Sequence, residues 1–302
     1  MPAFLTHKIA ADRIRDLITS PEAARVIDDH EDAYYSGAQG GDYFYSYKYY
    51  SMWAGYRYKM FGWALHRVRI QRFFHEAALY AGEQVPADVT KAFILGYTTH
   101  YALDMHVHPL IREMGPGAMT SHNIVESALD CMYAMQNGVD PWSFDKAQFV
   151  HDTHVPGDEI DAFFQAMMDR LYIGFTLPPS PYHITYAYLE KMQRMLQKTD
   201  RLSMLKRDVR DAFTLCKTRC LTYMPYEEIR DLFDYERLFG RLSGAEAHAG
   251  RLIDTLAGYW YDGHDLSSID EAFYNINMNG VPITPLEVRK PFQKLYKKAP
   301  IV

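Results

Sequence analysis

The chain has 302 residues, 48% of them hydrophobic, with 13 histidines, 3 cysteines and a net charge of −6. This length and apolar content suffice for a sizeable core, and the acidic balance argues against a general nucleic-acid binder, which carries a basic stripe. Cys131, Cys216 and Cys220 are too few for a disulfide framework or a cysteine-rich zinc module. Any metal must therefore be held by nitrogen and oxygen ligands.

The N-terminus does not resemble a targeting signal. Its first sixteen residues contain no apolar core, and charged residues begin at Lys8. No stretch reaches the roughly 18 uncharged apolar residues that a membrane-spanning helix requires. We expect a soluble cytoplasmic protein without a transmembrane segment.

Apolar residues recur every three to four positions along most of the chain, which predicts helices. The expected helices cover residues 11–29, 51–82, 88–108, 119–136, 158–173, 182–199, 205–222, 227–242, 245–261 and 284–298. Glycines and prolines such as Pro109 separate these segments, and we find no run of short alternating strands. The sequence predicts an all-α fold, organised as a single large domain over residues 1–302.

A cluster of histidines and carboxylates lies between residues 100 and 126. His100, Asp104 and His108 are spaced four residues apart, so on a helix they share one face. After a Gly-Pro-Gly turn, His122 and Glu126 repeat this spacing on the next expected helix. Two antiparallel helices would bring all five side chains together. Neutral imidazole and carboxylate groups are the ligands that zinc accepts without thiolate.

Other metal templates do not fit. The HExxH pattern of zinc peptidases is absent, because His75-Glu76 is followed by Ala77, Ala78 and Leu79. The Glu-x-x-His pairs of di-iron bundles are absent too, since no histidine has a glutamate three positions before it. The spacing of the cluster therefore favours a zinc centre of a different kind.

Five motifs occur in order along the chain: Thr6-His7, GAQGGDYFY from Gly37 to Tyr45, Leu65-His66-Arg67, GYTTHYALDMHVHP from Gly96 to Pro109, and SHNIVE from Ser121 to Glu126. Together they resemble the bacterial zinc-dependent phospholipase C family, which is related to single-strand-specific zinc nucleases. The resemblance covers residues 1–200 by motif, while residues 201–302 carry no motif that aligns. It implies an all-helical fold of the phospholipase C and zinc nuclease type with two to three zinc ions.

The resemblance also implies a role for individual residues. Asp42, His66, His100 and Asp104 would hold the first zinc, and Asp42 would be the general base. His108, His122 and Glu126 would hold the second zinc. His7 and the shared Asp104 would hold the third, with backbone atoms of the N-terminal residue.

We therefore expect a metal-dependent phosphoric ester hydrolase of the phospholipase C type. Zinc lowers the pKa of bound water from about 15.7 to about 7, and the activated water would attack a phosphodiester. The expected substrate is a small phosphodiester or a phospholipid. Two alternatives remain open: a nuclease or nucleotidase on the same metal framework, and a non-catalytic zinc-stabilised binding protein. We expect no sequence-specific nucleic-acid partner, and the sequence does not fix the oligomeric state.

Residues 43–58 contain nine aromatic residues in sixteen positions. Most of these rings are expected to pack between helices, and an interfacial patch toward lipid head groups is a second interpretation. Tyr43 directly follows Asp42, and family members that cleave choline lipids use aromatic rings to hold the quaternary ammonium. The resemblance therefore also implies Tyr43 as a substrate-binding residue.

Overall fold

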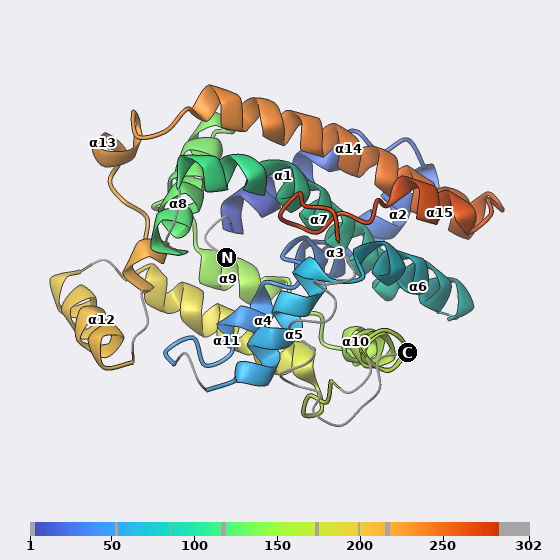
Figure 1. Cartoon of the computed structure of the whole chain (residues 1–302), viewed down its shortest axis with the longest axis horizontal. Helices are drawn as coiled ribbons and strands as arrows, with labels where there is room; N and C mark the ends of the chain where they lie inside the picture. The colour runs from blue at the N-terminus through green and yellow to red at the C-terminus, as the bar shows by residue number, and fades with distance from the viewer. Residues whose placement is uncertain are drawn as a thin grey trace.

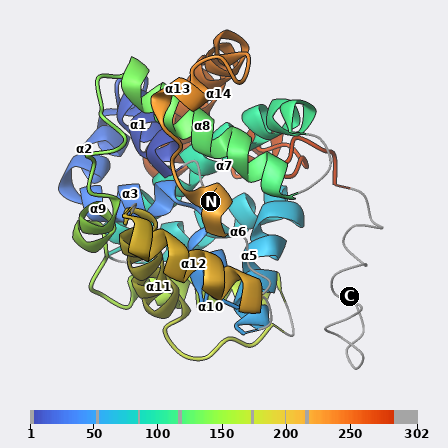
Figure 2. The ribbon, with the colours of Figure 1, turned by 90° about the vertical axis from the view of Figure 1, so that its left-hand side faces the viewer.

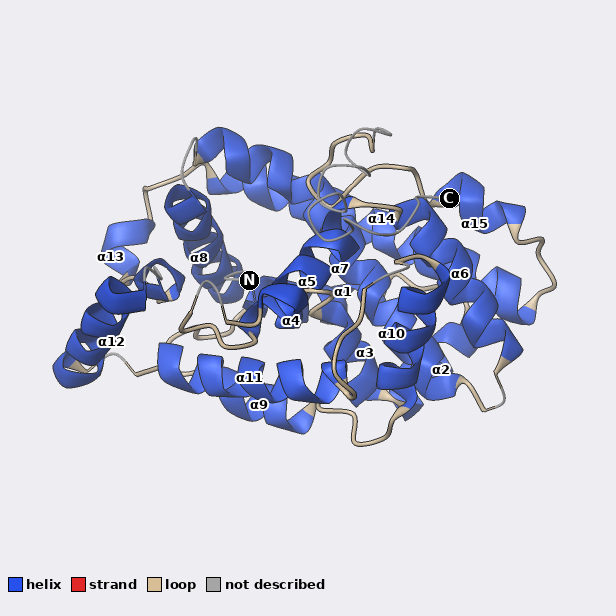
Figure 3. Ribbon diagram, turned by 60° about the horizontal axis from the view of Figure 1, so that its bottom comes forward, coloured by secondary structure: helices blue, strands red, loops and turns tan. Residues whose placement is uncertain are grey.

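The computed structural model describes residues 4–283, apart from 52–53, 85, 116–118, 173–174, 199 and 215–217. Throughout this described part the regular elements are helices (Figure 3), and the β pairing is limited to one isolated bridge between Ile276 and Pro282. The all-α prediction is confirmed.

The helices follow one another along the chain in this order: α1 (Phe4–Arg15), α2 (Pro21–Asp29), α3 (Glu31–Ala38), α4 (Tyr43–Ser46), α5 (Tyr56–Arg67), α6 (Ile70–Glu83), α7 (Asp88–Met114), α8 (Met119–Gln136), α9 (Lys146–Asp152), α10 (Glu159–Arg170), α11 (Pro181–Leu196), α12 (Arg201–Thr214), the 3-10 helix η1 (Thr218–Leu221), α13 (Tyr226–Ile229), α14 (Tyr235–Tyr261) and α15 (Ser267–Ala272).

Several expected boundaries differ from the observed ones. The helix expected over 119–136 is α8, but the helix expected over 11–29 is divided into α1 and α2, and the one over 51–82 includes α5 and α6. The helices expected over 227–242 and 245–261 are largely one long helix, α14, because helix interiors tolerate a glycine at modest cost. The helix expected over 284–298 lies outside the described residues.

Pro109 does not end its helix as the sequence suggested. It lies inside α7, which continues to Met114. Packing compensates for the disruption: Gly280 lies so close that an added Cβ would be 2.6 Å from Pro109 Cγ and 2.7 Å from the Met105 carbonyl oxygen. Tertiary contacts here override a local helix breaker.

The long helix α7 forms the centre of the molecule, with α14 lying along it and α3 crossing it (Figure 1). At the crossing with α3, an added Cβ on Gly96 would lie 1.9 Å from the Tyr34 carbonyl oxygen. An added Cβ on Gly37 would lie 2.1 Å from the Phe93 carbonyl oxygen. Only glycine permits this approach of two helix backbones, and it fixes α7 firmly in the core.

Most of the described rings of the aromatic stretch lie in the core or pack against it, as one interpretation of the sequence expected. The rings of Tyr43 and Phe44 are fully buried, and both meet Phe164 of α10 edge to face. Tyr50 and Tyr56 are exposed. The stretch therefore contributes mainly to the packing of α4 and α5 against α10 and α11.

The C-terminal third packs partly on the motif-bearing region and partly apart from it. Helix α14 contacts both α1 and α7. Helix α12 lies at one end of the molecule, on the left in Figure 1, and faces the viewer in Figure 2. The organisation of residues 1–302 as one domain stays a prediction. Among the described residues, no helix combines the length and apolar character needed to cross a membrane.

Candidate metal centre

Helices α7 and α8 meet with their histidine-bearing faces toward each other. His108 of α7 and His122 of α8 approach the same carboxylate oxygen: His108 Nε2 lies 3.0 Å and His122 Nε2 2.9 Å from Glu126 Oε1. One ligand atom from each of these three residues lies within 4.8 Å of the other two. The predicted second set of ligands is thus gathered in one place.

A second group surrounds the carboxylate of Asp104. His100 Nε2 lies 3.5 Å and His66 Nε2 4.0 Å from Asp104 Oδ2, and the two Nε2 atoms are 3.2 Å apart. Asp42 joins from the turn before α4, with its Oδ1 3.1 Å from His66 Nε2. All four residues of the predicted first set therefore lie together.

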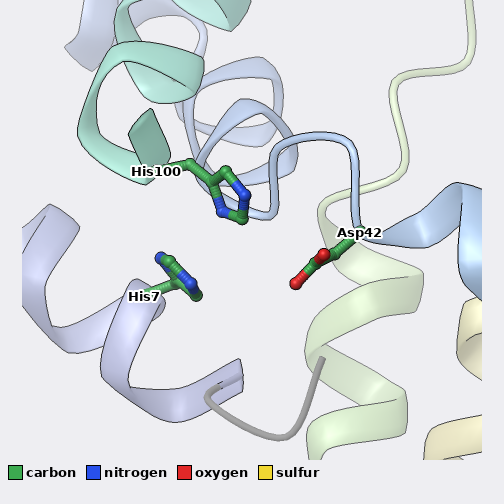
Figure 4. A group of neighbouring side chains, drawn as sticks. All are labelled: His7, Asp42 and His100. Carbon is green, nitrogen blue, oxygen red and sulfur yellow. The ribbon is translucent and has the colours of Figure 1, made fainter. Parts of the chain in front are cut away.

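His7 of α1 adjoins the same group from the other side. Its Nε2 lies 3.4 Å from Asp104 Oδ1, and its ring stacks on that of His100 with the ring centres 4.3 Å apart. Figure 4 shows His7, Asp42 and His100 directed toward one another, and these three form a further potential metal-holding group. The N-terminal backbone atoms expected to complete a third site lie outside the described residues.

Backbone carbonyls orient two of the imidazoles. His66 Nδ1 is 2.6 Å from the Gly62 carbonyl oxygen, and His108 Nδ1 is 2.6 Å from the Met278 carbonyl oxygen. With Nδ1–H donating in each case, Nε2 of the neutral imidazole keeps its lone pair for a metal ion.

Met278 links the C-terminal third of the chain to the centre. Its N–H donates to the His66 carbonyl oxygen at 2.9 Å, while its own carbonyl accepts from His108. The sequence analysis missed this residue, because contacts made by the backbone leave no side-chain signature.

Asp130 is a second residue that the sequence analysis missed. It lies on α8 one turn beyond Glu126, is fully buried, and accepts hydrogen bonds from the backbone N–H groups of Leu5 at 3.1 Å and Thr6 at 2.6 Å. The Tyr223 hydroxyl donates to it as well. Asp130 thus holds the first turn of α1 and, through it, His7. The spacing of four from Glu126 was the available signal.

The turn before Asp42 is shaped by glycine. Gly40 adopts a φ of +58°, and an added Cβ there would lie 2.1 Å from His100 Cδ2. An added Cβ on Gly41 would lie 3.0 Å from His66 Cε1. The two glycines therefore let the chain reverse and leave room for two ligand rings.

At His100 and Asp42, the surroundings favour the protonation states that bind metal. Burial lowers the pKa of His100 to about 3, so its imidazole is neutral at physiological pH. Burial alone would raise the pKa of Asp42, but nearby positive charge and the hydrogen bond with His66 outweigh it and hold that pKa well below its usual value. A neutral imidazole and an ionised carboxylate are ligand forms.

His108 behaves differently. Although burial lowers its pKa, the carboxylates of Asp104 and Glu126 outweigh this and raise the pKa to about 9. A metal at this group would therefore replace a proton as the partner of the carboxylates.

A cavity of about 280 Å³ opens onto these groups. All predicted metal-binding residues line it except His100, which is completely buried behind it. The remaining lining residues come from several helices and from the C-terminal third: Tyr45, Trp63, Arg67, Asn123, Leu221, Met278 and Asn279. Tyr43, expected to bind substrate, lies in the aromatic core and not on the cavity wall, whereas Tyr45 lines it.

The residues present fit a zinc centre. The donor atoms are imidazole nitrogens and carboxylate oxygens, and they converge in three groups among the described residues. His7 Nδ1 and His100 Nδ1 are buried and have no hydrogen-bond partner. A buried polar atom without a partner lowers the stability of the fold unless another favourable interaction at the site offsets that cost.

Comparison with known proteins agrees with this geometry. No curated protein and no solved structure matches the chain. A family model described as zinc-dependent phospholipase C matches residues 6–172, a span that contains every predicted ligand side chain and covers more than half of the chain. The chain therefore belongs to the zinc-dependent phospholipase C family.

Proposed function

We propose that the protein is a zinc-dependent phosphodiesterase that acts as a phospholipase C. The observation that carries this proposal is the convergence of two imidazole–carboxylate groups on one cavity: His66, His100 and Asp104 in one group, and His108, His122 and Glu126 in the other. Zinc ions bound there would act as Lewis acids and lower the pKa of water to about 7.

Two charged side chains complete the proposed site. Asp42 is an ionised hydrogen-bond acceptor on the cavity wall, suited to orient a water molecule. A carboxylate with so low a pKa is a weak base, so we assign it an orienting role in addition to metal binding. Arg67 supplies a positive charge at the wall for a phosphate oxygen, and its guanidinium lies 5.4 Å from the centre of the Trp63 ring.

In the proposed reaction a water oxygen forms a bond to phosphorus, and the bond from phosphorus to the alcohol oxygen breaks. The products are a phosphomonoester and a diacylglycerol-like alcohol, and the leaving alcohol oxygen takes up the proton that the attacking water gives up. Tyr45 and Trp63 offer aromatic faces to the head group. We assign head-group contact to these rings in place of Tyr43.

The first test measures zinc and turnover together. We expect at least two zinc ions per chain in the purified protein, and hydrolysis of a chromogenic phosphodiester and of phospholipid that a chelator abolishes. Asp42→Asn is expected to retain most of the zinc and lose activity. Fewer than one zinc per chain, or unchanged hydrolysis in Asp42→Asn, would contradict the proposal.

The same panel separates the alternatives. Activity on single-stranded nucleic acid alone would assign the centre to a nuclease and remove the phospholipase assignment. Bound zinc without turnover of any substrate would indicate a zinc-stabilised binding protein.

A further inference from the structure

Helix α12 is amphipathic, but its apolar face points to solvent and its charged face toward the protein. A helix packed against the core of a water-soluble protein has the reverse arrangement. Leu202, Leu205, Val209 and Phe213 are spaced three, four and four residues apart, so they form one stripe along the helix. Their exposed fractions are 59%, 60%, 48% and 86%. This apolar stripe faces solvent.

The face of α12 directed toward the protein is charged. Arg207 and Asp211 are buried. The Arg207 guanidinium donates to the Lys198 carbonyl oxygen at 2.6 Å and to the Thr222 hydroxyl. The helix is therefore held in this orientation by specific polar contacts, and rotating the apolar stripe inward would break them.

The stripe is not an ordinary scatter of exposed apolar residues. Exposed hydrophobic residues elsewhere in the described chain occur singly or in small numbers per element, whereas α12 carries four in line. A contiguous exposed apolar surface of this kind marks a binding face.

The charges around the stripe indicate what binds there. Residues 201–214 contain four basic and two acidic side chains, a local charge of +2 in a protein whose net charge is −6. Arg201 and Lys206 are exposed beside the stripe, and Arg210 lies over the Tyr49 ring at 5.6 Å. An apolar stripe bordered by basic residues complements the head-group region of an anionic membrane.

We infer that α12 is an interfacial helix that docks the protein on anionic phospholipid surfaces. The apolar stripe of Leu202, Leu205, Val209 and Phe213 would enter the head-group and acyl-chain boundary. The neighbouring Arg201 and Lys206, which are exposed, would meet lipid phosphates. Helix α12 lies outside the residues matched by the family model, so this surface is an addition to the metal-binding framework.

The position of α12 connects this surface to the cavity. The 3-10 helix η1 follows α12 in the chain, and its last residue, Leu221, lines the cavity. On the other side, Arg210 contacts Tyr49, four residues after the cavity residue Tyr45. Docking through α12 would bring these two cavity-lining segments close to the membrane. The inference does not depend on the proposed activity, because docking and turnover are separate measurements.

The test is co-sedimentation of the purified zinc-loaded protein with sucrose-loaded vesicles. One set contains phosphatidylcholine alone, and the other adds 30% phosphatidylglycerol. The lipid is analysed after sedimentation, so hydrolysis is recorded separately from binding. We expect at least about tenfold tighter binding to the anionic vesicles, weakening as salt is raised.

Three variants sharpen the test. Leu205→Ser/Phe213→Ser is expected to weaken vesicle binding at least about tenfold, because it replaces two of the four apolar side chains that would be buried in the lipid. Lys206→Glu is expected to weaken binding to anionic vesicles only. The matched control is Leu232→Ser, which removes a leucine that is 46% exposed in the segment between α13 and α14. It should bind as the wild type does.

Hydrolysis of a water-soluble phosphodiester reports on the metal centre alone and should be equal in the wild type and all three variants. Three results would overturn the inference: equal binding to both vesicle types, wild-type binding by the double variant, or a wild-type dimer that the double variant converts to monomer. The last result would assign the stripe to a second copy of the chain.

Discussion

The histidines of the candidate metal centre differ from two histidine pairs elsewhere in the molecule. His154 Nε2 lies 2.7 Å from His183 Nδ1, and His106 Nε2 lies 3.0 Å from His248 Nδ1. These distances are comparable to the 2.9 and 3.0 Å that separate Glu126 Oε1 from His122 and His108. None of the four histidines lines the cavity, however, and none belongs to the three potential metal-holding groups of the described chain.

The two sets of histidines differ in what surrounds them. At the candidate metal centre, imidazoles and carboxylates converge on an open cavity. At the centre, single carboxylate oxygens face two imidazoles from different positions, as Glu126 Oε1 faces His108 and His122. In the outer pairs, the imidazole nitrogens mainly face each other. Asp161, the carboxylate nearest to His183, already accepts the Tyr182 backbone N–H at 2.7 Å. Proximity of histidines alone therefore does not indicate a metal site.

Removing the carboxylate of Asp104, which several of these histidines face, should have the largest effect on the candidate metal centre. Asp104→Asn is expected to lose at least one zinc ion per chain and to reduce phosphodiester hydrolysis at least about a hundredfold, because even the partners behind metal ligands contribute about 10–100-fold. Metal analysis and steady-state kinetics measure both effects. The matched change in the outer cluster, Asp161→Asn, should leave the zinc content unchanged. Equal zinc loss in both variants would contradict the distinction.

Gly40→Ala tests whether the turn makes room for His100. The added Cβ combines a left-handed φ with a collision against the imidazole, so we expect a stability loss of about 3 kcal/mol and reduced zinc content. Gly138→Ala is the control, since Gly138 also has a positive φ of +75° but no atom within 4 Å of the added Cβ. Its cost should be about 1 kcal/mol, with zinc retained. Chemical denaturation distinguishes the two, and equal losses would refute the collision.

Asp130→Ala tests whether α8 holds the first turn of α1. It leaves two buried backbone N–H groups without their acceptor, and each costs about 1–3 kcal/mol. We also expect weaker binding of one zinc ion, because His7 loses its support. Tyr223→Phe removes one hydrogen bond to the same carboxylate but leaves both N–H groups paired, so its effect should be about 1 kcal/mol. Unchanged zinc affinity in Asp130→Ala would contradict the positioning role.

The smallest expected effect concerns the outer pair His106 and His248. Burial, together with His106 and Arg251, lowers the pKa of His248 to about 4. Burial also lowers the pKa of His106. The unfolded value is about 6.5, so between pH 6.5 and 4 the folded state binds fewer protons than the unfolded state. This contribution to stability is present above pH 6.5 and is lost as the pH falls toward 4.

Replacing His248 should therefore make the stability of the fold depend less on pH in the acidic range. We expect the Tm of His248→Gln to fall less than that of the wild type between pH 7 and 5, by a small amount because the ring is half-buried. The control is His151→Gln, at a histidine whose side chain is 66% exposed. A parallel decline in all three proteins would show that the outer pair does not contribute.

Much of the fold and the centre could be predicted from local pattern. The helix over 119–136 and the i, i+4 spacing of His100, Asp104 and His108 depend on the period of a single helix, which the sequence contains in full. The place of Pro109 inside α7 could not be predicted in the same way, because it depends on packing, as shown by the contact of Gly280 with Pro109. The division of the expected helix over 11–29 did have a local signal, which the apolar pattern missed: Ser20 caps α2 and Pro21 is its first residue.

The sequence by itself determined the all-α class, the family and the residues that gather at the candidate metal centre, because ligand type and helical spacing are local properties. Only the tertiary structure decided which atoms support them: the Met278 backbone beside His66 and His108, and Asp130 beneath α1. It also moved Tyr43 into the core and turned the apolar stripe of α12 outward. These outcomes depend on contacts between segments far apart in the chain, and no local spacing encodes them.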